Sequence, residues 1–423
     1  MLKRKIHYLN DIFRNFLLVV ATAALLLSVG CGGSSNSSRE ELQADFSDPE
    51  LPARLSAAFE SWAEARDLVG ASINVSSDDF NWDGTSGLVS EGGTKYQPTT
   101  QQRVGSITKT MTSVIILQLI EQNLLSLDTT MDNYFPDYPN AELITIEHLL
   151  THRSGIYDVT LDDRTYQTYV LSNPEKWITV DEILLWTYDS GNEVPSEINS
   201  LQVGETIPRG PACDPGACFH YSQPAYQVLG RVIETLTGKS LETVYEERIF
   251  SPLGMANSYI PTEDQADQPI GHTNLYGLLE NRVATNQIFT SLNGFNSSAL
   301  AAGGAISTSE DLMKFIRGLL EGSLLSETSM NLMQNWQDYP SSDESVERQY
   351  GLGLTFSEFD NVKEYSTIGH GGSVPGSGSK TLFIQELDVY VTVTRNTDVE
   401  STLLDTPILE ELVVSALLNE END

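Results

Sequence analysis

The 423-residue sequence contains little positive charge. It has 24 Lys and Arg residues against 59 Asp and Glu residues, which gives a net charge of −35. Such a surface repels nucleic acid and anionic lipid, so neither is an expected partner. The acidic residues are spread along the chain and form no acidic tail, which indicates a solvated surface.

Several catalytic and metal-binding signatures are also absent. The sequence has no G-x-S-x-G, which argues against the nucleophile elbow of the α/β-hydrolases. His148 and His152 are spaced like zinc ligands on a helix, but Leu149 follows His148, so the H-E-x-x-H pattern is missing. We therefore expect neither a metal nor a cofactor.

Long apolar runs are missing after the N-terminal region. Residues 1–30 predict an export signal, with a basic start at Lys3 to Lys5 and a short apolar run from Phe16 to Val29. Small residues before Cys31 resemble a bacterial lipobox, in which Cys31 would be lipidated. The alternative is an ordinary signal peptide with an incidental cysteine. We expect an exported protein, anchored to the cell envelope through lipid only, with a flexible linker at residues 31–50.

Only two cysteines, Cys213 and Cys218, follow Cys31. Exported chains meet oxidising conditions, so "CDPGAC" predicts a small disulfide-closed ring. A zinc site is the alternative, although two cysteines with His220 nearby make a poor ligand set.

The pattern of elements predicts an α+β fold at residues 51–423. A helix is expected from Pro52 to Ala65, followed by strands at 69–76 and 84–90. The middle of the chain is rich in helical patterns, including one at 307–322 capped by Ser307 or Thr308. Strands return at 350–356, 380–386 and 389–396, before a last helix at 407–418. This order predicts one antiparallel sheet built from both ends and flanked by helices, with a sheet lobe at about 51–105 and 345–423 and an inserted helical lobe at about 106–344.

A serine and a lysine stand at the start of an apolar helical pattern, "RVGSITKTMTSVIILQLIEQNLL". An amphipathic helix there would bury Met111, Val114 and Ile115 without needing Ser106 or Lys109. At positions i and i+3 these two share a helix face, and a buried lysine with a lowered pKa can help to activate a serine. The Ser-x-x-Lys spacing also arises by chance. Ser377 and Lys380 form a second copy of it, in a glycine-rich turn with no helical pattern after it.

Two further motifs follow in order and support Ser106. Tyr221-Ser222-Gln223 stands before a helical pattern, and His370-Gly371-Gly372 stands before a predicted strand. Together with Ser106-x-x-Lys109, they resemble the three active-site motifs of the class C β-lactamase-like serine hydrolases, a family of β-lactamases, D-alanyl-D-alanine carboxypeptidases and esterases. The likeness extends from about residue 51 onward. The Ser-Asp-Asn and Lys-Thr-Gly elements of class A β-lactamases are absent.

The resemblance implies a role for each of these residues. Ser106 would form an acyl-enzyme, with Tyr221 as general base and Lys109 favouring its phenolate. The backbone N–H groups of Ser106 and Ser373 would form the oxyanion hole, and Gly372 would let the strand approach closely. His370 stands where β-lactamases commonly have lysine, and it is expected to line the substrate site. Asn396 stands where the family often has an asparagine after its last strand.

Gln223 departs from the family pattern, which has asparagine at this position. Its amide is one methylene longer, so the fit to an amide substrate is expected to change, whereas ester hydrolysis is compatible with it. We therefore expect a carboxypeptidase-like or esterase-like hydrolase, with a small acyl compound (ester, peptide or β-lactam) as its partner. The alternatives are a β-lactamase and a non-catalytic protein that binds cell-wall peptides.

Overall fold

The computed structural model describes residues 42–66, 68–89, 93–188, 210–263, 293–340, 346–359, 364–374, 376–397 and 408–419. The predicted signal, Cys31 and most of the predicted linker lie outside these ranges. No helix in the described ranges is long and apolar enough to cross a membrane.

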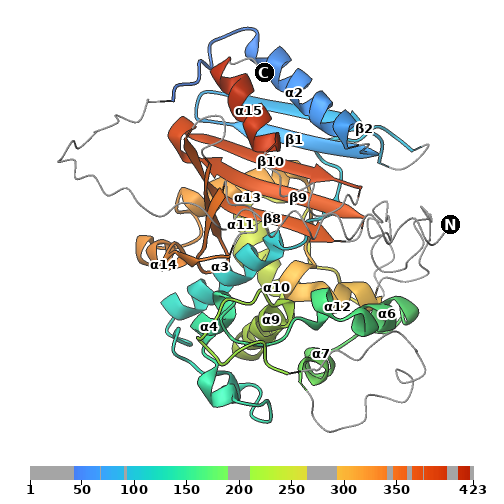
Figure 1. The fold of residues 1–423 in the computed structure, drawn as a ribbon, viewed down its shortest axis with the longest axis vertical. Helices are drawn as coiled ribbons and strands as arrows, with labels where there is room; N and C mark the ends of the chain where they lie inside the picture. Colours follow the sequence, from blue (N-terminus) through green and yellow to red (C-terminus); the bar gives the residue numbers. More distant parts are fainter. Residues whose placement is uncertain are drawn as a thin grey trace, which may run out of the picture. The chain divides into compact units, whose positions relative to one another are not determined.

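An eight-stranded antiparallel sheet forms the centre of the fold, in the order β2-β1-β10-β9-β8-β7-β6-β5 (Figure 1). The N-terminal strand β1 pairs with the C-terminal strand β10, so both ends of the chain build one sheet, as predicted. The strands β3 and β4 form a separate two-stranded sheet. The strand bounds are β1 Gly70–Ser76, β2 Asn81–Gly87, β3 Gln102–Arg103, β4 Ile306–Ser307, β5 Gln337–Asp338, β6 Val346–Tyr350, β7 Thr355–Phe359, β8 Tyr365–Val374, β9 Ser377–Ile384 and β10 Val389–Arg395.

Most of the helices lie in the segment between β3 and β5, which confirms the predicted α+β class with a helical insertion. The α-helices are α2 Leu51–Ala65, α3 Ile107–Glu121, α4 Ile146–Leu150, α5 Val159–Asp162, α6 Arg164–Ser172, α7 Val180–Thr187, α9 Gln223–Thr237, α10 Leu241–Tyr245, α11 Ser251–Leu253, α12 Asn293–Gly303, α13 Ser309–Leu320, α14 Glu327–Met333 and α15 Ile408–Leu418. Short 3-10 turns lie at Met131–Asn133, Ala141–Leu143 and Gln385–Leu387, and a π-helical turn lies at Glu246–Phe250.

Two strand predictions need correction. The strand expected at 350–356 is two strands, because β6 ends at Tyr350 and β7 begins at Thr355. Gly353 between them has φ +81°, a conformation that glycine adopts without strain and that turns the chain. The strand expected at 84–90 is β2, which begins earlier, at Asn81.

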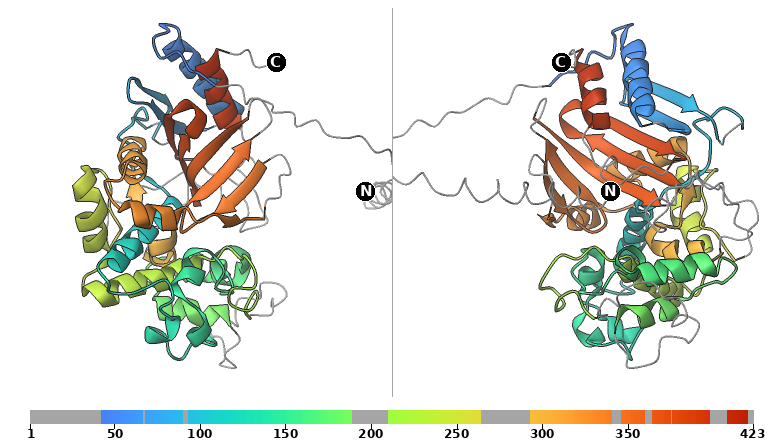
Figure 2. Two further views of the ribbon diagram at one scale, coloured as in Figure 1. Left: turned by 90° about the vertical axis from the view of Figure 1, so that its left-hand side faces the viewer. Right: turned by 45° about the vertical axis from the view of Figure 1, so that its right-hand side comes forward.

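Helices α2 and α15 cover one face of the sheet and pack against each other (Figure 2). Alternate residues of the strands, such as Ile73 in β1 and Val391 in β10, point into the apolar layer beneath them. Residues 42–50 were expected to be linker, yet Phe46 packs on this layer and stacks on Phe80 with ring centroids 5.5 Å apart. The packed chain therefore begins before residue 51.

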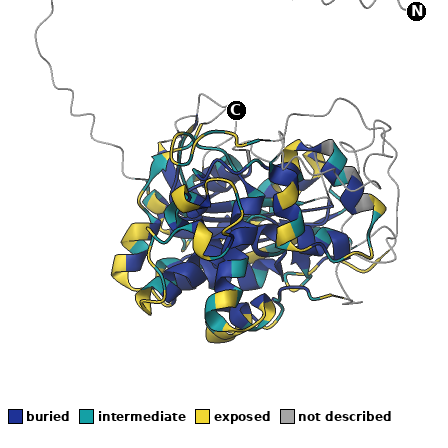
Figure 3. Cartoon of the chain, turned by 90° about the horizontal axis from the view of Figure 1, so that it is seen from below, coloured by how far each residue is buried: buried dark blue, intermediate teal, exposed yellow. Residues whose placement is uncertain are grey.

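Helix α3 runs through the centre of the helical region. It is not the amphipathic helix that the sequence suggested, because its polar residues Thr108, Thr112 and Ser113 are as fully buried as its apolar ones. A helix buried on all sides lies inside the core rather than on its surface. Figure 3 shows buried residues filling the interior of the fold, with exposed ones on the outer turns. The N-terminus of α3 is thus held rigidly.

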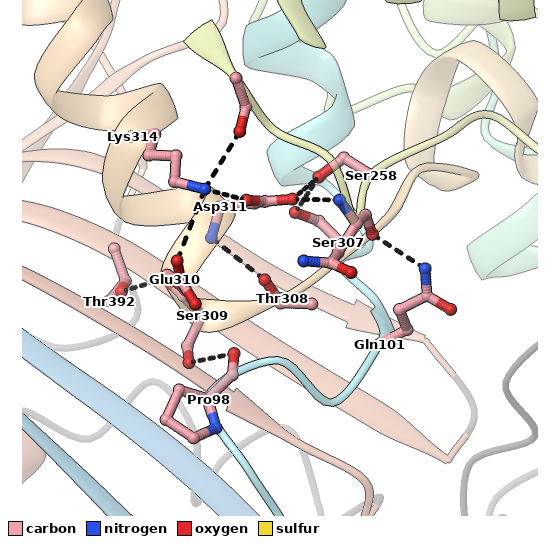
Figure 4. A network of polar contacts seen from close by, with 12 residues as sticks. Pro98, Gln101, Ser258, Ser307, Thr308, Ser309, Glu310, Asp311, Lys314 and Thr392 are labelled. Carbon is pink, nitrogen blue, oxygen red and sulfur yellow. Dashed lines mark hydrogen bonds and ion pairs between the residues drawn. The ribbon is translucent and has the colours of Figure 1, made fainter. Parts of the chain in front are cut away.

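A buried polar network fixes the β3–β4 pair that leads to α3 (Figure 4). Thr308, one of the two predicted caps, accepts a hydrogen bond from the backbone N–H of Asp311 and begins α13. The Asp311 carboxylate accepts hydrogen bonds from Ser258 Oγ and the Asn257 backbone, and it pairs with Lys314. Because Ser258 also contacts Ser307 of β4, the network ties this small sheet to the helices around it.

Candidate active site

A cleft lies where β8 passes the N-terminus of α3. Six of the predicted site residues line this cleft, although they come from three separate stretches of the sequence. They are Ser106, Tyr221, Gln223, His370, Gly372 and Ser373. The structure therefore brings the three motifs together around one cavity.

Ser106 occupies the turn that begins α3. Its backbone is helical, with φ −63°, and its side chain makes no capping hydrogen bond, so the hydroxyl is not committed to the helix. Gly105 before it has φ +53°, and a side chain there would meet the Ser373 backbone nitrogen at 2.7 Å. Only glycine fits this turn, which presents the serine to the cleft.

Lys109 lies one turn further along α3 and is fully buried. Its Nζ lies 3.1 Å from Ser106 Oγ and donates a 2.8 Å hydrogen bond to the carbonyl of Ala302, at the end of α12. Burial lowers the pKa of Lys109 to about 7, against the opposing attraction of Asp158. The amine therefore exchanges a proton near neutral pH, as a general base must.

Tyr221 lies beside both residues. Its ring centroid is 4.7 Å from Lys109 Nζ, and its phenol shares a hydrogen bond with the Ser106 side chain. Burial raises the pKa of Tyr221 well above its usual value, and the bond to Ser106 opposes this only in part. A resting phenolate, which the resemblance implied, is therefore disfavoured in the free protein. The protonated phenol can instead pass a proton between Ser106 and Lys109.

Strand β8 carries the third motif in its own interior, not ahead of a strand as the sequence suggested. Gly372 lies so close to the α3 turn that a Cβ would be 1.9 Å from the Val104 carbonyl and 2.9 Å from the Ser106 nitrogen. This approach places the backbone nitrogens of Ser106 and Ser373 on the same side of the cleft. Two N–H groups in such an arrangement can stabilise a developing oxyanion.

His370 is buried, and both of its ring nitrogens have partners. Nδ1 lies 2.5 Å from the Gly371 carbonyl, and Nε2 lies 3.1 Å from the Tyr350 hydroxyl. Since a carbonyl only accepts, Nδ1 carries the proton and Nε2 accepts from Tyr350. Burial lowers the pKa of His370 to about 4. His370 is therefore uncharged at neutral pH, unlike the lysine that β-lactamases commonly have at this position.

Gln223 begins α9 at the edge of the cleft. Its backbone N–H donates to Asp158 Oδ2 at 2.9 Å, and its side-chain Oε1 lies beside Gly303 at the end of α12. Within the described part of the chain, its amide makes no hydrogen bond with Lys109. The acceptor of the lysine is instead the Ala302 carbonyl.

Other residues that the sequence singled out lie outside this constellation. Ser377 and Lys380 lie on β9, where residues three apart point to opposite faces, and Lys380 pairs with Glu410. Asn396 donates to the Leu88 and Val89 carbonyls and does not line the cleft. A disulfide joins Cys213 and Cys218 in the segment before Tyr221.

Sequence reasoning missed two buried residues next to the site. His152 had been weighed only as a zinc ligand with His148, but His148 closes the capping box of α4, and His152 Nδ1 accepts a hydrogen bond from the Ser222 backbone. Asp158 belongs to no recognised motif, and its carboxylate accepts a hydrogen bond from the Gln223 backbone N–H. No local sequence pattern reveals these contacts, because the residues are joined across more than sixty positions.

The fold and the Ser-Lys-Tyr arrangement are those of a β-lactamase-like serine hydrolase. A family model described as Beta-lactamase matches residues 55–413, and the chain belongs to that family.

Relatives of this family include hydrolases of several kinds. The chain is 26% identical to "Penicillin-binding protein 4" of Amycolatopsis lactamdurans, over 65% of this chain and 69% of that protein. It is 30% identical to "Esterase EstB" of Burkholderia gladioli, over 48% of this chain and 50% of the esterase, so the match spans only half of that relative. A crystal structure of a D-stereospecific amidohydrolase from Streptomyces sp. aligns with a TM-score of 0.64 and 25% identity, over 86% of this chain and 98% of that one.

Proposed function

We propose that this protein is a serine hydrolase that cleaves acyl bonds through an acyl-enzyme on Ser106, with esters as its preferred substrates. One observation carries the proposal: the Ser106 hydroxyl lies 3.1 Å from a buried amine whose pKa is near neutrality. The relatives, which include an esterase and an amidohydrolase, support the same chemistry.

The chemical steps follow from the contacts in the cleft. Ser106 Oγ attacks the substrate carbonyl carbon, and its proton passes to neutral Lys109, directly or through the Tyr221 phenol. The carbonyl oxygen gains negative charge beside the N–H groups of Ser106 and Ser373. When the intermediate collapses, the leaving alcohol takes the proton back from Lys109. Water then repeats the sequence on the acyl-enzyme and releases the acid.

The preference for esters rests on His370 and Gln223. His370 is neutral and hydrogen-bonded on both sides, so it supplies no cation for a substrate carboxylate. The Gln223 side-chain oxygen lies beside Gly303, and in the part of the chain that the structure describes its amide makes no hydrogen bond with Lys109, which supports a poor fit to a substrate amide. An ester has no amide N–H to satisfy, so this poor fit does not affect it.

A soluble form, residues 39–423, tests the proposal with p-nitrophenyl esters, nitrocefin and a D-alanyl-D-alanine peptide, read by rate and by intact mass. We expect ester turnover that S106A abolishes and that S377A, in the other Ser-x-x-Lys copy, retains. Release of D-alanine with a stable nitrocefin adduct would make the protein a carboxypeptidase, and rapid nitrocefin turnover would make it a β-lactamase. Equal rates for wild type and S106A would leave only a binding protein.

We also propose that the protein is exported and lipid-anchored at Cys31. The basic start, the short apolar run and the small residues before Cys31 support this. Fractionation of cells that express the full chain tests it: C31S should move the protein from the membrane to the soluble fraction. Unchanged membrane association would contradict the anchor.

A further inference from the structure

The turn that carries Tyr221 is held by two side chains from a single loop. His152 Nδ1 accepts a 3.0 Å hydrogen bond from the Ser222 backbone N–H, and Asp158 Oδ2 accepts a 2.9 Å bond from the Gln223 backbone N–H. These are the two residues directly after Tyr221. The first N–H groups of a helix have no partner within the helix, so an external acceptor fixes where α9 begins.

His152 also contacts the Tyr221 ring itself. The two ring centroids lie 4.1 Å apart with an interplanar angle of 32°, and the histidine is fully buried. Because Nδ1 accepts from Ser222, the proton of the neutral ring lies on Nε2. Among the described residues Nε2 has no hydrogen-bond partner, and the ring centroids of Tyr226 and Tyr350 lie 5.1 and 5.0 Å from that of His152. The imidazole thus has one polar anchor, the Ser222 backbone, and one flat face against the phenol.

The backbone of His152 has an unusual conformation that serves this contact. Its φ is +57°, in the left-handed region that non-glycine residues rarely adopt. Its carbonyl accepts a 2.8 Å hydrogen bond from the His220 backbone, directly before Tyr221. The residues on both sides of Tyr221 are therefore bound to His152.

Both carboxylate oxygens of Asp158 are also engaged in hydrogen bonds. Its buried carboxylate accepts from the Thr160 and Leu161 backbone and the Thr160 hydroxyl through Oδ1, and from the Gln223 backbone through Oδ2. Burial raises the pKa of Asp158, whereas these hydrogen bonds and the charge of Lys109 oppose that shift and favour the carboxylate. Its negative charge also raises the pKa of Lys109, against the larger effect of burial, so one carboxylate acts on both the turn and the lysine.

We propose that His152 and Asp158 are positioning residues that fix the Tyr221 phenol against Ser106 and Lys109. The inference rests on the proposed acyl transfer at Ser106. Neither side chain needs to touch the substrate: each acts by holding backbone and ring geometry, for which a misplacement of about 1 Å can cost about 100-fold in rate.

Four variants separate the contacts. H152N keeps an acceptor near the position of Nδ1 and loses the ring, whereas H152F keeps a ring and loses the acceptor. D158N keeps one of the two acceptor oxygens and loses the charge, and D158A loses both oxygens and the charge. H148N and D163N are matched controls, because His148 and Asp163 cap the neighbouring helices α4 and α6. All are assayed for burst-phase acylation by a p-nitrophenyl ester at about pH 9, where Lys109 is neutral, with thermal melting in parallel.

We expect H152F and D158A to lose about 100-fold in acylation rate with KM nearly unchanged, and H152N and D158N to lose about tenfold. The two controls should acylate at the wild-type rate. Acylation of both H152F and D158A within about threefold of wild type would overturn the inference, as would losses that appear only in KM. If H152F or D158A fails to fold, the folded conservative variants decide: a wild-type rate in H152N and D158N overturns it. Failure of the proposed function is distinct, because wild type would then show no burst that depends on Ser106.

Discussion

The Nζ of Lys109 donates a hydrogen bond to the carbonyl oxygen of Ala302 over 2.8 Å. This carbonyl lies at the C-terminal end of α12, where unsatisfied carbonyls carry partial negative charge. It holds the amine in place in both protonation states, since ammonium and neutral amine can each donate one N–H. Reorientation of Lys109 during proton transfer is therefore unnecessary, which fits a base that must act twice in each catalytic cycle.

The first prediction concerns the pH dependence of catalysis. Lys109 has a pKa of about 7 in the free protein and must be neutral to accept the Ser106 proton. We expect kcat/KM for an uncharged ester to rise with pH and to reach a plateau above an inflection near 7. Stopped-flow measurement of acylation between about pH 5 and pH 9 checks this. K109R, whose guanidinium stays protonated throughout this range, should be inactive and show no inflection. If K109R had the same pH profile as the wild type, Lys109 would be excluded as the base.

The second prediction tests the close approach of β8. A Cβ at position 372 would lie 1.9 Å from the Val104 carbonyl, so G372A must push the strand away from the α3 turn. This moves the Ser373 N–H from the oxyanion, and we expect kcat to fall about 100-fold. A Cβ at Gly371 would meet open space, so G371A should lose far less. Similar losses in both variants would contradict this account.

The third prediction concerns substrate choice at Gln223. In Q223N the amide is one methylene shorter and can no longer reach its place beside Gly303, so it is free to meet a substrate amide. We expect the ratio of amide to ester kcat/KM to rise about tenfold, because a matched amide contact is restored. The rates with a D-alanine anilide and a p-nitrophenyl ester measure this ratio. A fall in both rates by the same factor would show that Gln223 does not select between them.

The fourth prediction concerns stability in acid. The pKa of His370 is about 4 in the folded protein and near 6.5 in an unfolded chain. Between these values the unfolded chain binds a proton that the folded one does not, so stability is lost as pH falls from about 6.5 to 4, by about 3 kcal/mol. H370Q should lose correspondingly less over the same range, as measured by urea unfolding. An equal loss in H370Q would assign the acid sensitivity to other groups, among them His152, whose pKa burial also lowers.

The sequence sufficed for the fold class and for the three motifs that meet at the cleft. Ser106 and Lys109 stood out as polar residues at the start of an apolar helical pattern, and Tyr221 stood out through the resemblance to the family's motifs. The hydrophobic pattern did not show that α3 is buried on every side, since Thr108 and Thr112 find their partners in α12 and in the segment that follows it. In a sequence, a buried polar residue whose hydrogen-bond partner lies in a distant segment cannot be told from a polar residue at the surface.

The contacts around Tyr221 were out of reach for a related reason. His152 and Asp158 accept hydrogen bonds from backbone N–H groups, which every residue except proline possesses. The residue types at positions 222 and 223 therefore do not indicate these contacts. The protonation states of Lys109 and Tyr221 could not be predicted from the sequence either. A lysine beside a tyrosine suggests a phenolate, but the outcome depends on how deeply both are buried, and here burial dominates.

The order of strands also constrains how the chain can reach its folded state. Strand β1, near the start of the packed chain, has β2 on one side and β10 on the other, and β10 is the last strand among the described residues. Until β10 is available, β1 and β2 form an isolated hairpin in which the β1 edge that β10 later covers is open, and such a hairpin is marginal in water. Closure of the sheet thus links residues some 320 positions apart, a long-range step that slows folding and leaves that edge exposed meanwhile.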